Sequence, residues 1–194
     1  MTATNETSTL SRLSRAAGSL LLTAALTVAM SGAALGITYI GTKVYTPNHS
    51  EVRALSVSGD LTSAQKTSLN NQIKKSYPNA TMISGSTAHY NCHSYAWYSQ
   101  STGSTIWINE PYPYWKDGSY KLQKSTGYTN SIPSGVANGA KVYYDDGATY
   151  KTYHSAIKFS STKFRSKWGQ GPLMEHSPTY TPYGATKSLL YYKR

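Results

Sequence analysis

The sequence predicts an α+β domain in which two N-terminal helices, one of them carrying the single cysteine, pack on an antiparallel β-sheet. Helical periodicity occurs before residue 100, whereas the segments beyond it alternate apolar with polar residues. Turns rich in Gly, Pro and Ser separate these later segments, which favours an antiparallel sheet over a doubly wound parallel one. A chain of 194 residues with 39% hydrophobic content suffices for one such domain.

The N-terminal region is expected to lie outside this fold. Residues 1–15 are polar and include Arg12 and Arg15, and residues 16–41 contain no charged side chain. Small residues follow the most apolar part, as a signal-peptidase site requires, but the stretch is also long enough to cross a bilayer at roughly 20 residues per crossing. Residues 1–41 therefore form a signal peptide or an uncleaved membrane anchor. Either alternative makes the remainder secreted or exposed on the extracellular face of the membrane.

The elements of the exported part follow in order. Residues 42–59 show no sustained period and are expected to form a linker or lead-in to a domain of residues 60–194. Asp60 or Thr62 can cap an amphipathic helix that Pro78 ends, and a second helix is expected to begin near Asn91. Strands are expected over residues 105–109, 140–144, 153–159 and 163–168, with loops over residues 110–118 and 125–139.

The charge indicates the partners that this surface attracts. There are 19 Lys and Arg against 8 Asp and Glu, a net charge of +11, which suits anionic wall polymers. Nucleic acid is not expected, because export removes that partner and no recognition motif is present. We expect a monomer whose only contact with a membrane is through its N-terminal segment. The expected solvated basic face consists of Lys74, Lys75, Lys163, Arg165, Lys167, Lys193 and Arg194.

Cys92 is the residue that most directly indicates chemistry. It is the only cysteine, so no intramolecular disulfide can form. If Asn91 caps the second helix, Cys92 lies in the first turn, where free N–H groups and the helix dipole stabilise a thiolate. The alternative interpretation is that Cys92 is an unreactive residue that packs in the core as a small hydrophobic side chain. A base near the thiol would favour the nucleophile over the unreactive core residue.

His154 is the expected base. It begins the apolar strand HSAIKF after an acidic turn, so the sheet fixes its backbone. His49 and His176 are the other candidates, and His176 is equally a candidate surface histidine. A zinc site built from His89, Cys92 and His93 with a downstream histidine is disfavoured, because the spacing lacks two close ligand pairs, and no metal or other cofactor is expected.

The order of these residues resembles the papain-like superfamily, especially the NlpC-type and CHAP-type bacterial cysteine peptidases and amidases. The likeness spans roughly residues 85–180 and consists of a helix-start cysteine, a strand histidine about 60 residues later and a further polar residue. Ser166-Lys167-Trp168-Gly169 is similar to the Asn-Ser-Trp-Gly stretch of papain-type enzymes, with Ser166 in place of Asn. The usual Asp-Cys-Ser-Gly-Leu of NlpC-type enzymes is replaced by Asn91-Cys92-His93-Ser94-Tyr95. The motifs NCHSYAW, HSA and SKWG also resemble those of a group of secreted bacterial proteins.

The resemblance implies a papain-like fold and hydrolysis of amide bonds in peptidoglycan peptides or proteins. Cys92 would be the nucleophile, His154 the base, and Ser166 or His176 the residue that orients the imidazole. The side chains expected around the oxyanion or the substrate are Asn91, Ser86, His93, Trp115 and Trp168. Trp97 and Trp107 are expected in the core. Two rival functions remain: a non-catalytic wall- or carbohydrate-binding module, and a secreted antibacterial or toxin-like effector.

Overall fold

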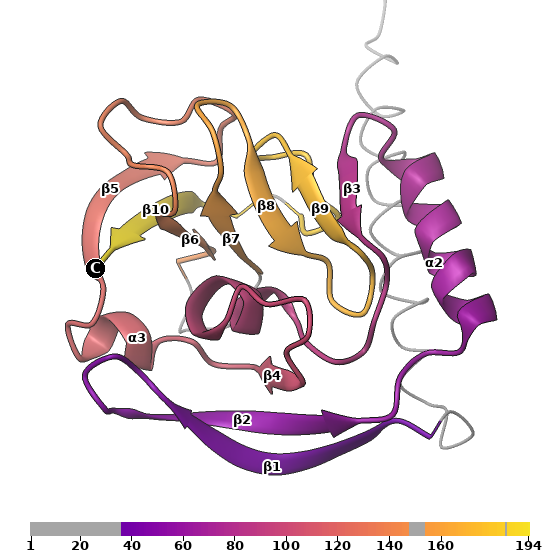
Figure 1. Cartoon of the computed structure of the whole chain (residues 1–194). Helices are drawn as coiled ribbons and strands as arrows, with labels where there is room; N and C mark the ends of the chain where they lie inside the picture. The colour runs from indigo at the N-terminus through magenta and orange to yellow at the C-terminus, as the bar shows by residue number, and fades with distance from the viewer. Residues whose placement is uncertain (1–35, 148–153, 185) are drawn as a thin grey trace, which may run out of the picture.

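The computed structural model describes residues 36–147, 154–184 and 186–194 as two β-sheets with three short helices between and beside them (Figure 1). The elements are β1 (Thr38–Tyr45), β2 (Glu51–Ser58), α2 (Ser63–Ser76), β3 (Thr81–Ser84), η2 (Ser94–Tyr98), β4 (Ile106–Ile108), α3 (Pro113–Lys116), β5 (Lys121–Gly127), β6 (Lys141–Asp145), β7 (His154–Lys158), β8 (Phe164–Lys167), β9 (Leu173–His176) and β10 (Ser188–Lys193).

The smaller sheet has the order β1-β2-β4. Strands β1 and β2 form an antiparallel hairpin in which Val44 pairs with Val52, and β4 adds to β2 with Ile108 opposite Ala54. These four side chains are buried on the inner face of the sheet. The segment 42–59, expected as a linker or lead-in, is therefore mostly hairpin and contributes to the core.

The larger sheet has the order β3-β9-β8-β7-β6-β10-β5, and all neighbouring pairs are antiparallel. One face meets η2 and the small sheet across a core that includes Tyr95, Trp97, Ile157, Leu173 and Tyr192. The other face carries a second core that includes Val142, Tyr144, Ala156, Phe164 and Leu189. Because both faces are covered, polar groups on the central strands must find partners inside the protein.

Helix α2 lies beside β3 at one end of the large sheet (Figure 1). Thr62 caps it: its side chain accepts the N–H of Gln65, while the Gln65 side chain accepts the N–H of Thr62. The backbone N–H of Tyr77 closes the last turn on Ile73, directly before Pro78. The sequence-based prediction of this helix and of Thr62 as a possible cap is confirmed.

The predicted fold class is wrong. The chain is mostly β-sheet, with two sheets of three and seven strands, and its helices are short pieces that do not form a helical layer packed on one sheet. The papain-like α+β arrangement is thereby corrected. The physical reason is that the mixed-polarity segments at residues 38–58 pair with each other, which their sequence pattern does not signal.

The four predicted strands are present as β4, β6, β7 and β8. Of the predicted signal peptide or anchor, residues 1–35 lie outside the described residues. Within the described ranges, the structure contains no helix of the length and apolar character needed to cross a membrane.

Candidate thiol–imidazole site

Cys92 lies in the helical turn that continues into η2. This helix packs against β4 of the small sheet and against β6, β7 and β8 of the large sheet. Asn91 caps this turn, since its side-chain oxygen accepts the N–H of Ser94 at 3.0 Å. The Asn91 amide also donates to the carbonyl of Ile108 at 2.6 Å, which ties the turn to β4. Asn91 thus acts in the structure as a helix cap and anchor, and its amide is already engaged.

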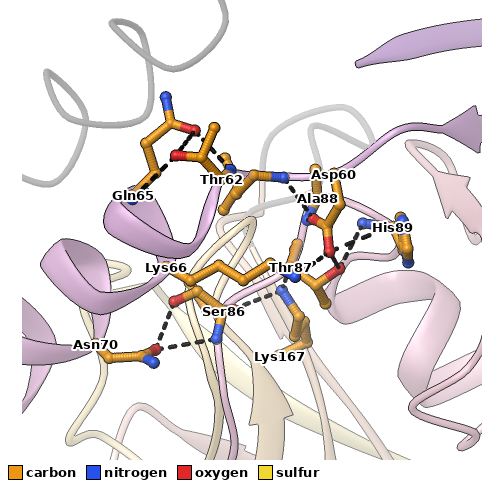
Figure 2. Close-up of polar contacts among 12 residues, drawn as sticks. Asp60, Thr62, Gln65, Lys66, Asn70, Ser86, Thr87, Ala88, His89 and Lys167 are labelled. Atoms are coloured by element: carbon orange, nitrogen blue, oxygen red, sulfur yellow. Dashed lines mark hydrogen bonds and ion pairs between the residues drawn. The ribbon is translucent and has the colours of Figure 1, made fainter. Parts of the chain in front are cut away.

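A network around Asp60 holds the segment that leads into Cys92, as Figure 2 shows. Asp60 Oδ1 accepts the backbone N–H groups of Leu61 and Ala88, both at 2.8 Å. Oδ2 accepts the Thr87 hydroxyl at 2.9 Å and lies 2.5 Å from Lys66 Nζ. Partial burial raises the pKa of Asp60, but these hydrogen bonds outweigh it and lower the pKa to about 2. Asp60 is therefore an ionised link between the start of α2 and the approach to Cys92.

Ser86 belongs to the same network. Its N–H and its hydroxyl both donate to Asn70 Oδ1 on α2, at 3.0 and 2.7 Å. Ser86 was expected as an oxyanion-binding residue, and the structure gives it a partner on the helix instead. It fixes the segment before Cys92 to α2.

The sulfur of Cys92 is buried and surrounded by backbone donors. The residue is 5% exposed, and the backbone N–H groups of Ser155, His93 and Cys92 itself favour the ionised form of the sulfur. Burial is the largest effect and raises the pKa of the thiol to about 11, although these N–H groups and the charge of Lys167 act in the opposite direction. The resting side chain is consequently a neutral thiol. The expectation that the helix start alone would yield a thiolate omitted this burial.

Ser155 of β7 connects the cysteine turn to the large sheet. Its hydroxyl lies 2.8 Å from His93 Nδ1 and accepts the indole N–H of Trp97 at 2.8 Å. His93 is buried, and burial lowers its pKa to about 3. His93 was expected around the oxyanion or the substrate, and in the structure it is an internal residue whose ring is hydrogen-bonded to Ser155.

His154, the predicted base, immediately precedes Ser155. Its ring stacks on Tyr183 with centroids 4.0 Å apart and meets Tyr144 edge-on at 4.9 Å. The side chain is fully buried, and neither ring nitrogen has a hydrogen-bond partner among the described residues. Burial lowers the pKa of His154 well below its ordinary value, and neighbouring His176 and His93 lower it further, so the imidazole is neutral. The structure places His154 one residue from a backbone contact of Cys92, without a direct hydrogen bond to the sulfur.

Ser166 and His176, the two candidates for orienting His154, are bonded to each other. Ser166 Oγ lies 2.7 Å from His176 Nε2, and the other ring nitrogen of His176 lies 2.8 Å from the carbonyl of Ser177. Trp168 donates its indole N–H to Ser166 Oγ at 3.0 Å. His176 is fully buried rather than a surface residue, and its ring centroid is 6.5 Å from that of His154. All three residues form an internal polar cluster beside His154, and Trp168 is a core side chain.

Lys167 is a functional candidate that sequence reasoning missed. It was placed on a solvated basic face, but the structure buries it completely beside the Cys92 turn. Its ammonium donates to the carbonyls of Thr87, Gly169 and Gly171 (Figure 2 shows the first contact). The only local sequence signal for this set of three carbonyl acceptors was the Gly-rich turn that directly follows Lys167.

Two of the three tryptophans assigned to the core or to a cleft wall lie elsewhere than predicted. Trp97 is in the core as predicted. Trp115, expected as a cleft wall, packs against Trp97 and Tyr143 at 4.9 Å and stacks on Tyr192 at 5.3 Å. Trp107, predicted in the core, is only partly buried and lines a shallow hollow of about 150 Å³ on the small sheet. The hollow is lined by Arg53, Ala54, Leu55, Trp107, Asn109 and Glu110.

Fold and site together define a two-sheet β protein with one buried thiol next to buried histidines. A family model described as a domain of unknown function (DUF7689) matches residues 81–191, and the chain belongs to this family. The match includes Cys92, His154 and Lys167. No curated protein and no solved structure matches the chain. Among the described residues, no group of three or more His, Cys, Asp or Glu side chains is arranged to hold a metal ion.

Proposed function

We propose that this protein is a hydrolase of amide bonds that uses Cys92 as its nucleophile and His154 as its proton acceptor. The observation that carries the proposal is the fully buried imidazole of His154, whose two ring nitrogens have no partner in the described structure. A buried polar group without a hydrogen bond costs about 1–3 kcal/mol, and such groups require an explanation in strain or function. His154 immediately precedes Ser155, whose backbone acts on the only thiol of the chain, and a neutral imidazole with a free lone pair is suited to accept a proton.

The charge states define the order of events. Burial keeps both Cys92 and His154 neutral, so the thiol proton passes to the imidazole as the sulfur bonds to the amide carbonyl carbon. The C–N bond then breaks, the amine leaves with that proton, and an acyl thioester stays on Cys92. Water, deprotonated by the imidazole, cleaves the thioester and restores the thiol. The net reaction consumes one amide and one water and yields one acid and one amine.

The resting site is closed in this proposal. The thiol is buried and the imidazole stacks on Tyr183, so binding of the substrate must expose the sulfur and turn the ring toward it. Such closed sites complete their catalytic hydrogen bonds only when substrate is bound.

Peptidoglycan peptides or proteins are the proposed substrates. The net charge of +11 favours an anionic matrix such as the bacterial wall, and the predicted export segment agrees with a substrate outside the cytoplasm. The oxyanion would be met by the backbone N–H groups that favour the ionised sulfur, of which Ser155 contributes the one from the sheet.

The test is to incubate the full chain separately with purified peptidoglycan and with casein, and to identify products by mass spectrometry. We expect Cys92→Ala and His154→Ala to lower the rate of product formation by at least about a hundredfold, in the range typical of general base and nucleophile removal. His49→Ala, at an exposed histidine, is the matched control and should retain full activity. Equal cleavage by the wild type and Cys92→Ala would reject the proposal.

One observation favours a second candidate, a glycan-binding role. The hollow on the small sheet combines the partly exposed ring of Trp107 with the polar side chains of Arg53 and Glu110, a set suited to stacking on a sugar ring and bonding its hydroxyls. Co-sedimentation with insoluble peptidoglycan tests it. Trp107→Ala should reduce the bound fraction severalfold, while Tyr45→Ala, an exposed aromatic residue on the neighbouring hairpin, should not. Unchanged sedimentation of Trp107→Ala removes this candidate.

A further inference from the structure

Lys167 is buried, and removing its charged ammonium from water costs free energy. The end of β8 places its side chain in the interior, and the residue has no exposed surface. Burial lowers the pKa of its ammonium to about 7. A buried ammonium is tolerated where all three of its donors are satisfied, and here they are.

The three acceptors come from two separate pieces of backbone. Gly169 and Gly171, at 2.5 Å each, belong to the turn between β8 and β9, where Gly169 adopts a φ of 59° that favours glycine. Thr87, at 2.9 Å, belongs to the segment that leads into Cys92. The same two pieces are joined again by the bond from the Thr87 N–H to the Gln170 carbonyl at 3.0 Å. Lys167 therefore fixes the turn and the approach to Cys92 to one point.

The charged and titratable groups that face this ammonium are few. Cys92 and Asp60 each favour its charged form, and Tyr90 lies with its ring centroid 5.1 Å from Nζ. Burial raises the pKa of the Tyr90 phenol to about 12, so it stays neutral, and Asp60 is already paired with Lys66. The one group in this set that changes charge during the proposed reaction is the thiol of Cys92.

We infer that Lys167 is a positioning residue of the Cys92 site, which anchors the approach to Cys92 and stabilises negative charge on its sulfur as the thiol loses its proton. The inference rests on the proposed function for its role in catalysis. Its electrostatic part concerns only the thiol, so it can be measured without any substrate.

A purely structural role of Lys167 predicts a different change in the reaction rate of the Cys92 thiol. If Lys167 only held the backbone together, its loss would loosen the segment before Cys92, and the buried thiol would react faster or at an unchanged rate. If its charge stabilises the thiolate, the loss of that charge makes the thiol react more slowly. The sign of the change therefore separates the two roles.

The experiment measures alkylation of Cys92 by iodoacetamide in the full chain between pH 6 and pH 10, followed by mass spectrometry. Cys92 is the only cysteine, so the reaction reports on one sulfur. Lys167→Gln keeps hydrogen-bond donors but removes the charge, and Lys167→Arg keeps the charge. Lys158→Gln is the matched control, since Lys158 is also buried in the large sheet and its ammonium donates to Asn138 at 2.8 Å.

We expect Lys167→Gln to react roughly tenfold more slowly than the wild type near pH 6, equivalent to one pKa unit. The difference should shrink above about pH 7, where the Lys167 ammonium of the wild type loses its proton. Near pH 6, Lys167→Arg and Lys158→Gln should react at the wild-type rate. A Lys167→Gln rate at pH 6 that equals or exceeds that of the wild type in the folded protein overturns the inference, as does an equal change in Lys158→Gln. Should circular dichroism show Lys167→Gln to be unfolded, Lys167→Arg decides: a tenfold slower reaction despite the retained charge overturns the inference. An altered profile without any amide hydrolysis would reject the proposed function and leave this inference intact.

Discussion

Asp60 Oδ1 accepts the backbone N–H of Ala88 at 2.8 Å, which joins the start of α2 to the segment before Cys92. The bond crosses 28 residues of chain and has the Thr87 hydroxyl bond beside it. Together with the hydrogen bonds of Lys167, it fixes Thr87 and Ala88, which lie shortly before the Asn91 cap. The position of the thiol is thus determined by polar bonds rather than by apolar packing alone.

Asp60→Asn should lower the free energy of unfolding at neutral pH. The folded-state pKa of about 2 lies below the ordinary 3.8, so Asp60 stabilises the fold above pH 3.8, and this contribution is lost as the pH falls through about 2. Allowing for solvent screening, we expect a loss of about 1–2 kcal/mol at pH 7 and almost none at pH 2. Urea denaturation at both pH values measures it. Glu51→Gln, which removes an exposed ion pair with Lys43, is the control and should change stability by less than about 0.5 kcal/mol.

His154→Phe should stabilise the protein while it abolishes the proposed activity. Phenylalanine keeps the ring that stacks on Tyr183 and removes two buried nitrogens that have no partner in the described structure. Removing that desolvation penalty should raise the free energy of unfolding by about 1 kcal/mol. His176→Phe is the contrasting variant, because both nitrogens of His176 are paired, and it should destabilise the fold. Thermal melting of the two variants decides, and a lower melting temperature for His154→Phe would contradict the prediction.

Local sequence signals predicted only part of this structure. Thr62 with Gln65 forms a capping box that the sequence makes visible, and the alternation in β6, β7 and β8 identified these strands. The hairpin β1–β2 was missed because its mixed polarity reflects one buried and one exposed face without regular alternation. It is held by strand pairing and by the core cluster to which its Val44, Val52 and Ala54 belong, which are tertiary effects.

The candidate site likewise contains features that the sequence could predict and features that it could not. The position of Cys92 at a capped helix start could be predicted, since Asn91 and the residues after it are local. The burial of Lys167 could not, because its three acceptors are carbonyls that only the folded backbone brings together. The pairing of Ser166 with His176 likewise depends on the register between β8 and β9.

Acid should destabilise the fold between about pH 6.5 and pH 4. Burial lowers the pKa of His93 to about 3 and of His176 to about 4, and that of His154 well below its usual value. These histidines stay neutral when folded but take up protons when unfolded, so their contribution is complete above pH 6.5 and declines as the pH falls. Each contributes a slope of at most about 1.4 kcal/mol per pH unit. Urea denaturation at pH 7, 6 and 5 measures the slope, which His176→Phe should reduce and His49→Asn, at an exposed position, should not.

Gly59→Ala should test whether the hairpin β1–β2 is part of the folded unit. Gly59 follows β2 with a φ of 72°, and a Cβ atom there would lie 1.9 Å from the carbonyl oxygen of Gly36. The strained backbone alone costs an L-residue about 1 kcal/mol, and relief of the clash would pull residue 36 away from the start of β1. Gly41→Ala in the middle of β1 is the matched control, because a Cβ atom there meets nothing within 4 Å. We expect a loss of at least about 1–2 kcal/mol for Gly59→Ala and no loss for Gly41→Ala in urea denaturation. Equal stability of the two variants would mean that the hairpin contributes little to the stability of the domain, and the segment would then behave as the linker that its sequence pattern suggests.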